Sequence, residues 1–352
     1  MWPANALTKR LNLKWPIIQA PMGIMSTPAL AAAVTNAGGL GGLGLWGLAA
    51  EDAGRRIAGF RQMSGGSLNV NYPLWPEPKT SPDIVEPMRR HLQVHYDASG
   101  LGKVPQPQGI AGEVSPEHLA MLMEAKPEAV SFHFGLPEAP IVRAIKDAGI
   151  FVISSATTVA EARRLEASGV DAVIAQGSEA GGHRATFTGV DMSMQAGLFS
   201  LLPQVVDAVR VPVIAAGGVA DGRTVAAAFM LGASAVQLGT AFLHCEEANV
   251  LPAHRTALAE ADESCTVVTD MISGRPARYI RNKLLDGLVA CGLKPLPIPA
   301  QLSLTLPLGQ TGDRELTPLF AGQSASLVRH RKAADLVAGL ASDALGRLRT
   351  FA

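Results

Sequence analysis

Short runs of apolar residues recur along the chain, and each ends in glycine, proline or a polar residue. Most are followed by a longer segment with apolar residues at spacings of three and four, which is typical of an amphipathic helix. The pattern predicts strands at residues 17–22, 40–45, 68–73, 129–134, 150–155, 171–176, 212–216 and 235–239. It predicts helices at residues 28–37, 50–62, 82–91, 116–125, 140–148, 159–168, 198–209 and 221–231.

This alternation of strands and helices indicates the α/β class. Continuous apolar strands suit a parallel sheet that helices cover on both faces, and eight strand–helix units suit closure into a TIM (β/α)8 barrel. A doubly wound open sheet is the competing fold. It is disfavoured because no GxGxxG motif follows the first strand.

The regular alternation is interrupted twice. Residues 74–112 lengthen the third unit, and residues 244–313, which include a proline-rich stretch, follow the eighth strand. Helical character returns over residues 317–348. We therefore predict a barrel built from residues 1–243 and 314–352, with residues 244–313 forming a small inserted lobe after strand eight that covers the active site.

Composition and charge narrow the range of partners. Hydrophobic residues make up 48% of the chain, and 30 basic residues balance 30 acidic ones. A neutral chain gives no electrostatic reason to expect nucleic acid or an anionic membrane as partner. The sequence has no apolar stretch long enough for a membrane span and no signal-peptide pattern. Three cysteines without a CxxC pair fit a reducing compartment, so we expect a cytoplasmic protein. We also expect it to be a monomer or a homodimer.

Two glycine-containing loops follow the last strands of the predicted barrel. They are Gly217-Gly218 after strand seven and Gly239-Thr240 after strand eight. TIM barrels commonly bind a phosphate at this place, because glycine lets backbone N–H groups approach phosphate oxygens. We predict a phosphate site here, with a pair of sharp turns as the alternative.

The stretch from Gln176 to His183, Gln-Gly-Ser-Glu-Ala-Gly-Gly-His, follows strand six. Its glycines permit close ligand approach, and His183 can exchange a proton near neutral pH. We predict a functional role for this histidine. His133 ends strand four and is a second candidate, with a structural role as the rival interpretation. Asn71 on strand three can hydrogen-bond a flat heteroaromatic ring or form a turn.

Three other side chains have weaker assignments. Met22 can pack against a planar ring or simply fill the core. Arg275 and Arg278 can bind an anion, but paired arginines more often anchor one segment to another, so we favour an anchoring role. No histidine, cysteine or carboxylate cluster has metal-ligand spacing, and no serine has a triad-like histidine. We therefore predict neither a metal site nor a hydrolase triad.

These segments, taken in order, resemble the nitronate monooxygenases, formerly called 2-nitropropane dioxygenases, and among them class I. A single glycine-rich match would be a weak signal, whereas several in register on one barrel are a strong one. The resemblance extends from residue 16 to about residue 285. It rests on residues 16–22, 26–40, 69–71, 130–135, 175–184, 215–222 and 232–242.

The resemblance implies a non-covalent FMN, with its phosphate on the two glycine loops and its ring near Gln176 and Asn71. His183 matches the catalytic histidine of the family, and His133 matches a second site histidine. The implied reaction is the oxidation of alkyl nitronates, such as propionate 3-nitronate, or nitroalkanes by O2 to carbonyl compounds and nitrite. By motif position, the FMN-binding residues are Ala20, Met22, Asn71, Gln176, Gly181, Gly217, Gly218, Gln237, Gly239 and Thr240.

One departure from the class I pattern concerns the substrate. Class I members usually carry tyrosines and a lysine before the closing helices, but residues 297–308 contain neither. The alternative function is an NAD(P)H-dependent flavin reductase that acts on quinones or enoyl thioesters. A flavin- or phosphate-binding barrel without turnover is disfavoured because His183 is retained.

Overall fold

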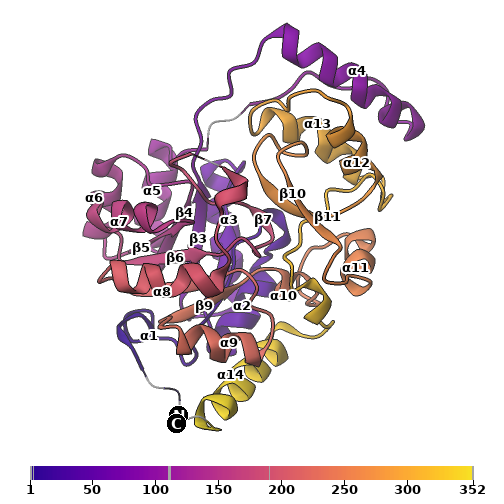
Figure 1. The fold of residues 1–352 in the computed structure, drawn as a ribbon. Coiled ribbons are helices and arrows are strands. Elements are labelled where there is room, and N and C mark those ends of the chain that lie inside the picture. Colours follow the sequence, from indigo (N-terminus) through magenta and orange to yellow (C-terminus); the bar gives the residue numbers. More distant parts are fainter. Residues whose placement is uncertain (1, 3, 110–111, 190, 351–352) are drawn as a thin grey trace.

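The computed structural model describes residue 2 and residues 4–109, 112–189 and 191–350. Within these residues, eight parallel strands form one sheet that helices surround (Figure 1). The order of neighbouring strands is β1-β9-β8-β6-β5-β4-β3-β2. The strands are β1 (Ile17–Gln19), β2 (Gly41–Gly44), β3 (Leu68–Pro73), β4 (Ala129–His133), β5 (Phe151–Ala156), β6 (Ala172–Gln176), β8 (Val213–Ala216) and β9 (Ala235–Leu238).

The sheet closes between its first and last members. Ile18 forms a parallel bridge with Leu40, just before β2. The Gln19 amide donates to the Leu40 carbonyl and the Leu40 amide donates to the Ile17 carbonyl, both at 2.9 Å. These bonds join β1 to the β2 edge, so the predicted TIM barrel is confirmed. Strand β1 is shorter than predicted, since Pro21 has no amide to continue the ladder.

Between the barrel strands, seven helices of the described chain pack on the outside of the barrel, and a polar residue caps the start of four of them. Thr27, Ser115, Thr158 and Asp221 each accept a backbone N–H in the first turn of the helix that follows, a standard N-terminal cap. The helices are α2 (Pro28–Asn36), α3 (Ala50–Met63), α5 (Pro116–Ala125), α6 (Ala139–Asp147), α7 (Val159–Ala167), α8 (Leu198–Ala208) and α9 (Gly222–Met230).

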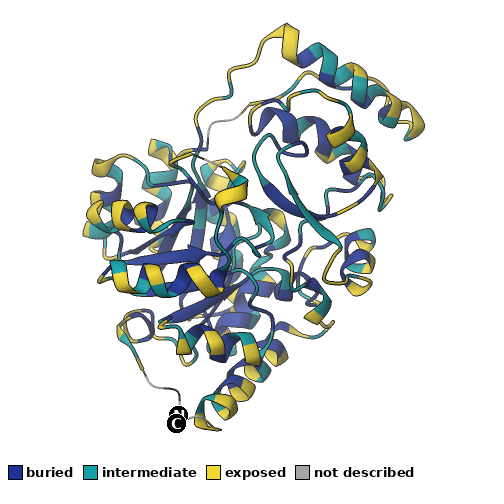
Figure 2. Ribbon diagram, viewed as in Figure 1, coloured by how far each residue is buried: buried dark blue, intermediate teal, exposed yellow. Residues whose placement is uncertain are grey.

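The hydrophobic core has two layers, and Figure 2 shows the buried strands inside the partly exposed helices. The outer layer lies between the strands and the helices. The inner layer fills the barrel and includes Leu7 and Leu11, which are fully buried beside Ile18 and Leu40. Because Leu7 belongs to α1 (Ala6–Arg10), this short helix seals one end of the barrel. None of the helices in the described residues is long and apolar enough to span a membrane.

A second hydrophobic cluster lies beside the barrel. It contains β11 (Ala277–Ile280), which pairs with β10 (Thr266–Thr269), and side chains of α12 (Lys283–Ala290) and α13 (Ala300–Gly309). Helix α4 (Pro82–Ala98), from the lengthened third unit, packs here rather than on the barrel (Figure 1). The Tyr96 hydroxyl donates to the Leu304 carbonyl at 2.9 Å. The proposed inserted lobe therefore shares its core with a helix from the third unit.

The closing segment differs from the prediction of helix over residues 317–348. The final helix, α14, begins only at Ala333 and runs to Thr350, packed beside α9 and α2. Before it, the chain contains one short 3-10 turn, Ala325–Leu327. The helical pattern was misleading because the Gly322 amide and the Ser324 hydroxyl bond to loops at the barrel mouth, and only short turns form around them. Two short helices, α10 (Thr240–Leu243) and α11 (Pro252–Ala259), follow β9.

Candidate active site

The predicted phosphate loops lie together at the carboxyl end of the barrel. Gly217 and Gly218 have φ values of +102° and +71°, which favour glycine over any residue with a side chain. A Cβ added to Gly181 would lie 2.5 Å from the Gly322 nitrogen, so the loop after β6 touches the segment before α14. The structure thus brings four separate segments to one place: 177–182, 217–218, 239–240 and 321–324.

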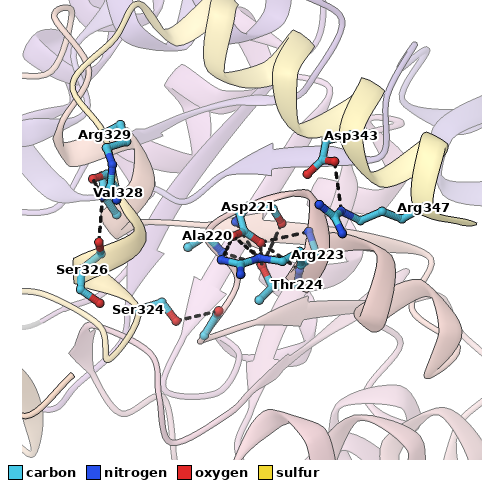
Figure 3. Close-up of polar contacts among 11 residues, drawn as sticks. Ala220, Asp221, Arg223, Thr224, Ser324, Ser326, Val328, Arg329, Asp343 and Arg347 are labelled. Atoms are coloured by element: carbon cyan, nitrogen blue, oxygen red, sulfur yellow. Dashed lines mark hydrogen bonds and ion pairs between the residues drawn. The ribbon is translucent and has the colours of Figure 1, made fainter. Parts of the chain in front are cut away.

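Side chains from the last of these segments hold the loops in position. Ser324 Oγ donates to the Gly218 carbonyl at 2.8 Å, and the Gly322 amide donates to Thr240 Oγ1 at 2.9 Å. Figure 3 shows the hydrogen bond of Ser324 and, separately, the polar contacts of Asp221, the residue that caps α9. Within the described residues, the amides of Gly218 and Gly239 have no recorded hydrogen-bond acceptor. We call Gly217, Gly218, Gly239 and Thr240 the cradle.

Ala20 and Met22 lie against the cradle. A Cβ added to Gly239 would meet Ala20 Cβ at 3.6 Å and Met22 Sδ at 3.8 Å, which are ordinary contacts. The Ala20 amide donates to the Leu238 carbonyl, and the Met22 amide donates to Ser26 Oγ. This part of the barrel mouth is therefore lined by small and thioether groups around a glycine.

Asn71 and Gln176 are already engaged in internal hydrogen bonds. Asn71 Nδ2 donates to the backbone and side-chain oxygens of Ser131 at 3.0 and 3.1 Å. Gln176 Nε2 donates to the His183 carbonyl at 3.1 Å, and Gln176 Oε1 accepts from the Ala185 amide at 2.9 Å. Gln176 thus fixes the backbone on both sides of residue 184. Gln237, on β9, is buried near the same end of the barrel.

His183 is positioned by the lobe as well as by the barrel. It belongs to β7 (Gly182–His183), which pairs with β11, so that His183 lies opposite Ala277. Its Nε2 atom is 2.9 Å from Ser273 Oγ, and Ser273 Oγ donates to the Arg275 carbonyl at 3.0 Å. Because a carbonyl only accepts, the serine proton is used there, and His183 Nε2 must be the donor to Ser273. Nδ1 is then the basic nitrogen of the neutral ring.

Aromatic side chains surround this histidine. Phe134 lies edge-on to His183, with ring centres 6.1 Å apart, and its centre is 5.1 Å from that of His133. Phe320 covers another part of His183 at 5.7 Å. The cluster continues through Trp75, whose centre is 6.0 Å from Phe134. We call His133, Phe134, His183, Arg275 and Phe320 the wall.

The family of this chain follows from its similarity to known proteins. A family model described as nitronate monooxygenase matches residues 4–343. The chain belongs to the nitronate monooxygenase family.

Two relatives named nitronate monooxygenase illustrate how far the similarity extends. The one from Paraburkholderia phytofirmans is 39% identical over 362 residues, covering 99% of this chain and 98% of that protein. The one from Pseudomonas aeruginosa is also 39% identical, with coverage of 97% and 99%. The family predicted from the sequence motifs is therefore confirmed.

Solved structures give the same result for the fold. The chain is similar to a nitroalkane oxidase from Streptomyces ansochromogenes, with a TM-score of 0.91, 36% identity, and coverage of 99% of this chain and 100% of that one. It is also similar to FabK from Thermotoga maritima, with a TM-score of 0.76, 29% identity, and coverage of 99% and 100%.

The electrostatics of this nitronate monooxygenase family member keep both site histidines neutral at ordinary pH. Burial lowers the pKa of His183 to about 3, with further contributions from nearby His133 and Arg275. Burial and Arg275 also lower the pKa of His133 to about 4, against an opposing hydrogen bond to the His183 backbone. His133 Nδ1 is 3.1 Å from Ser155 Oγ. Neither ring therefore contributes a positive charge to the site near neutral pH.

Three side chains close to His183 were not among the residues predicted from the sequence: Ser273, Phe134 and Phe320. They come from three distant segments, and of these only Phe134 lies in a segment that carries the family resemblance, residues 130–135. Phe134 alone carries a local signal, since it adopts a φ of +68° beside Gly135, an unusual conformation for a bulky residue. Arg275 was predicted to anchor the lobe. It does bond to the Thr186 carbonyl, but its guanidinium also stacks on Phe134 with Cζ 4.0 Å from the ring centre.

Proposed function

We propose that this protein oxidises alkyl nitronates, or the parent nitroalkanes, with O2 and a non-covalently bound FMN, giving carbonyl compounds and nitrite. The observation that carries the proposal is His183, a neutral histidine with Nε2 fixed by Ser273 and Nδ1 left as its basic nitrogen. It lies at the carboxyl end of a TIM barrel, where enzymes of this fold carry their active sites.

The residues at the barrel mouth fit an FMN. The cradle offers backbone N–H groups of glycines to a phosphate, and its positive φ angles let the backbone approach closely. Ala20, Met22 and Gly239 provide a low, apolar surface for a flat ring. We propose that these residues hold the cofactor, together with Gln176, Gly181, Gln237 and Asn71. The flavin, when bound, supplies the electron-transfer chemistry with the nitronate and oxygen.

The protein groups would act on the substrate as follows. With a neutral nitroalkane, His183 Nδ1 accepts the proton from the carbon that bears the nitro group, and Ser273 holds the ring in the required orientation. With a nitronate, that proton is already absent, so His183 only positions the substrate. Phe134 and Phe320 exclude water from the wall, which strengthens the polar interactions that remain.

Anaerobic mixing of the FMN-loaded protein with single reductants tests this function. We expect propionate 3-nitronate to bleach the flavin absorbance rapidly, and NADH or NADPH alone to leave it unchanged. Bleaching by a reduced nicotinamide but not by a nitronate would instead support a flavin reductase acting on quinones or enoyl thioesters.

A variant of His183 tests whether this histidine acts as a base. His183→Asn should retain FMN while turnover of neutral nitroethane falls by about 10²- to 10⁴-fold, the usual contribution of a general base. Turnover of ethyl nitronate should fall less, because no proton has to be removed. Equal losses for the two substrates would contradict the role of His183 as a base.

A further inference from the structure

A second cavity lies beside the carboxyl ends of β2 and β3, next to the start of α5. Its volume is about 260 Å³, and it is lined by residues 45–49, Tyr72, Pro73, Glu113, Ser115 and His118. Tyr72 belongs to the outer layer of the core, between the strands and the helices. Among the described residues, no member of the cradle or the wall lines this cavity. It is therefore distinct from the site around His183.

Two residues of the lining carry buried polar atoms without a hydrogen-bond partner. Tyr72 is only 2% exposed, and its Oη atom has no partner within the described chain. The Nε1 atom of Trp46 is also buried and unpartnered there. An indole nitrogen can only donate, whereas a phenolic hydroxyl can donate or accept. Because an unpaired buried donor is costly, this pair favours a ligand that supplies an acceptor.

Two other polar side chains of the lining already have partners. His118 Nε2 is 3.1 Å from the Leu48 carbonyl, which can only accept, so the ring donates there. His118 Nδ1 is 3.0 Å from Ser115 Oγ, and this oxygen donates to Glu117 Oε2 at 2.7 Å. These bonds join the start of α5 to the loop after β2. They leave Trp46 and Tyr72 as the groups that can bind a polar atom of a ligand.

The rest of the lining is mainly apolar, and its charge is negative. Leu45, Leu48 and Pro73 supply hydrocarbon surface, and the ring of His118 lies edge-on to Tyr72 with centres 5.5 Å apart. Glu113 contributes a carboxylate, and the described lining contains no lysine or arginine. An anion would have to leave water without a cation to compensate it, so a neutral ligand is favoured.

We propose that this cavity is a second binding site, for a small neutral ring compound that carries a hydroxyl or carbonyl oxygen. The oxygen accepts from Trp46 Nε1 and bonds to Tyr72 Oη, while the ring packs on the apolar lining. A cavity of about 150 Å³ is enough to hold benzene, so the present volume suits one substituted ring. The inference is independent of the proposed function, because the two sites share no residue.

Trp46 also connects the cavity to the wall. Its ring centre is 5.3 Å from that of Trp75, and Trp75 is 6.0 Å from Phe134. A ligand bonded to the Trp46 indole therefore contacts the first member of a row of aromatic rings that ends beside His183. Binding should change the tryptophan fluorescence of the protein, which gives a direct readout that does not depend on turnover.

Calorimetric titration of the FMN-loaded protein with three rings of similar size tests the proposal. Phenol is neutral at pH 7 and should bind at least about fivefold more tightly than toluene, which lacks the oxygen; this is the value of one ordinary hydrogen bond. Benzoate should bind at least about tenfold more weakly than phenol, because the lining offers its charge no cation.

A matched pair of variants assigns the binding to this cavity. Tyr72→Phe keeps the ring and removes the hydroxyl, so phenol affinity should fall by about three- to tenfold while toluene affinity stays unchanged. Tyr96→Phe removes the hydroxyl of another buried tyrosine, which bonds to the Leu304 carbonyl outside the cavity. It should leave both affinities at their wild-type values.

Crystals soaked in 4-bromophenol give the position of the ligand from the anomalous signal of bromine. The expected density lies in the cavity, with the phenolic oxygen within hydrogen-bond distance of Trp46 Nε1 or Tyr72 Oη. Three outcomes would overturn the proposal: no binding of phenol up to about 10 mM, equal affinities for phenol and toluene, or bromine density confined to the His183 site. The first two need no variant, so they do not depend on how Tyr72→Phe folds.

Discussion

The cradle and the wall lie at the same end of the barrel but are built from different materials. The cradle consists mainly of backbone: Gly217 and Gly218 have positive φ angles, and the neighbouring Gly181 has no room for a Cβ. The wall consists of side chains that four separate segments bring together: residues 133–134, His183, Arg275 and Phe320. The cradle should therefore tolerate the loss of a side chain but not the addition of one. In the wall, by contrast, replacing any one side chain should change the properties of the site.

The largest effect should come from adding one carbon atom to the cradle region. Gly181→Ala would place a Cβ 2.5 Å from the Gly322 nitrogen and 2.6 Å from the Ala321 carbonyl carbon. Both are backbone atoms, so the loop has to move. We expect the dissociation constant for FMN to rise by more than about 100-fold, in line with severe overpacking, as measured by flavin fluorescence titration.

Gly287→Ala is the matched control for that substitution. Gly287 lies within α12, and an added Cβ meets nothing within 4 Å. FMN affinity should stay at the wild-type value, and stability should rise by about 0.5–1 kcal/mol, since alanine favours a helix. Wild-type FMN affinity in Gly181→Ala would show that the loop is not as tightly packed as the structure indicates.

Lowering the pH should have an intermediate effect on the free energy of unfolding, through the two histidines of the wall. His183 and His133 have folded-state pKa values of about 3 and 4, against an ordinary value near 6.5. The unfolded chain therefore binds more protons below pH 6.5, and the free energy of unfolding should decrease as the pH falls from 6.5 toward 4. We expect each histidine to contribute roughly 2 kcal/mol after allowance for partial exposure.

Urea unfolding at several pH values measures this dependence. His133→Asn should reduce the slope between pH 6.5 and pH 4, because one depressed group is removed. His254 is also buried, and its pKa is lowered to about 4, so His254→Asn should reduce the slope as well, although it also removes the 2.9 Å contact between His254 Nε2 and the Phe320 carbonyl. If the slope is the same in the wild type and His133→Asn, the histidine is not held neutral by its surroundings.

The smallest effect should follow the removal of a side chain from the edge of the cradle. Ser324→Ala deletes one hydrogen bond, from Ser324 Oγ to the Gly218 carbonyl. Since Gly218 keeps its backbone conformation through its neighbours, FMN affinity should fall by less than about fivefold, the value of one ordinary hydrogen bond. If Ser324→Ala lowered FMN affinity as much as Gly181→Ala, then side chains would matter to the cradle as they do to the wall.

The same distinction explains what the sequence could predict. The cradle glycines and His183 lie in contiguous motifs directly after strands, so their strand–loop position was readable from the pattern. Ser273 and Phe320 gave no such signal, because their place beside His183 depends on how the lobe returns to the barrel. Helix α4 could not be assigned either: its apolar spacing fits a barrel helix and a lobe helix equally well. The sequence also predicted too early a start for the final helix, because the hydrogen bonds of Gly322 and Ser324 to the barrel loops are tertiary contacts.

Because β7 pairs with β11, the lobe sets the orientation of His183, the proposed base. The barrel alone carries His183 to the mouth, but the Ala277 partner and Ser273 that set its rotation both belong to the lobe. Whenever the lobe detaches locally from the barrel, His183 loses its orientation even though every barrel strand stays folded. The fraction of competent molecules is therefore limited by the local stability of a small second core, which contains α4 from the third unit. Substitutions in α4, far along the chain from any reacting group, should lower activity before they lower the stability of the barrel.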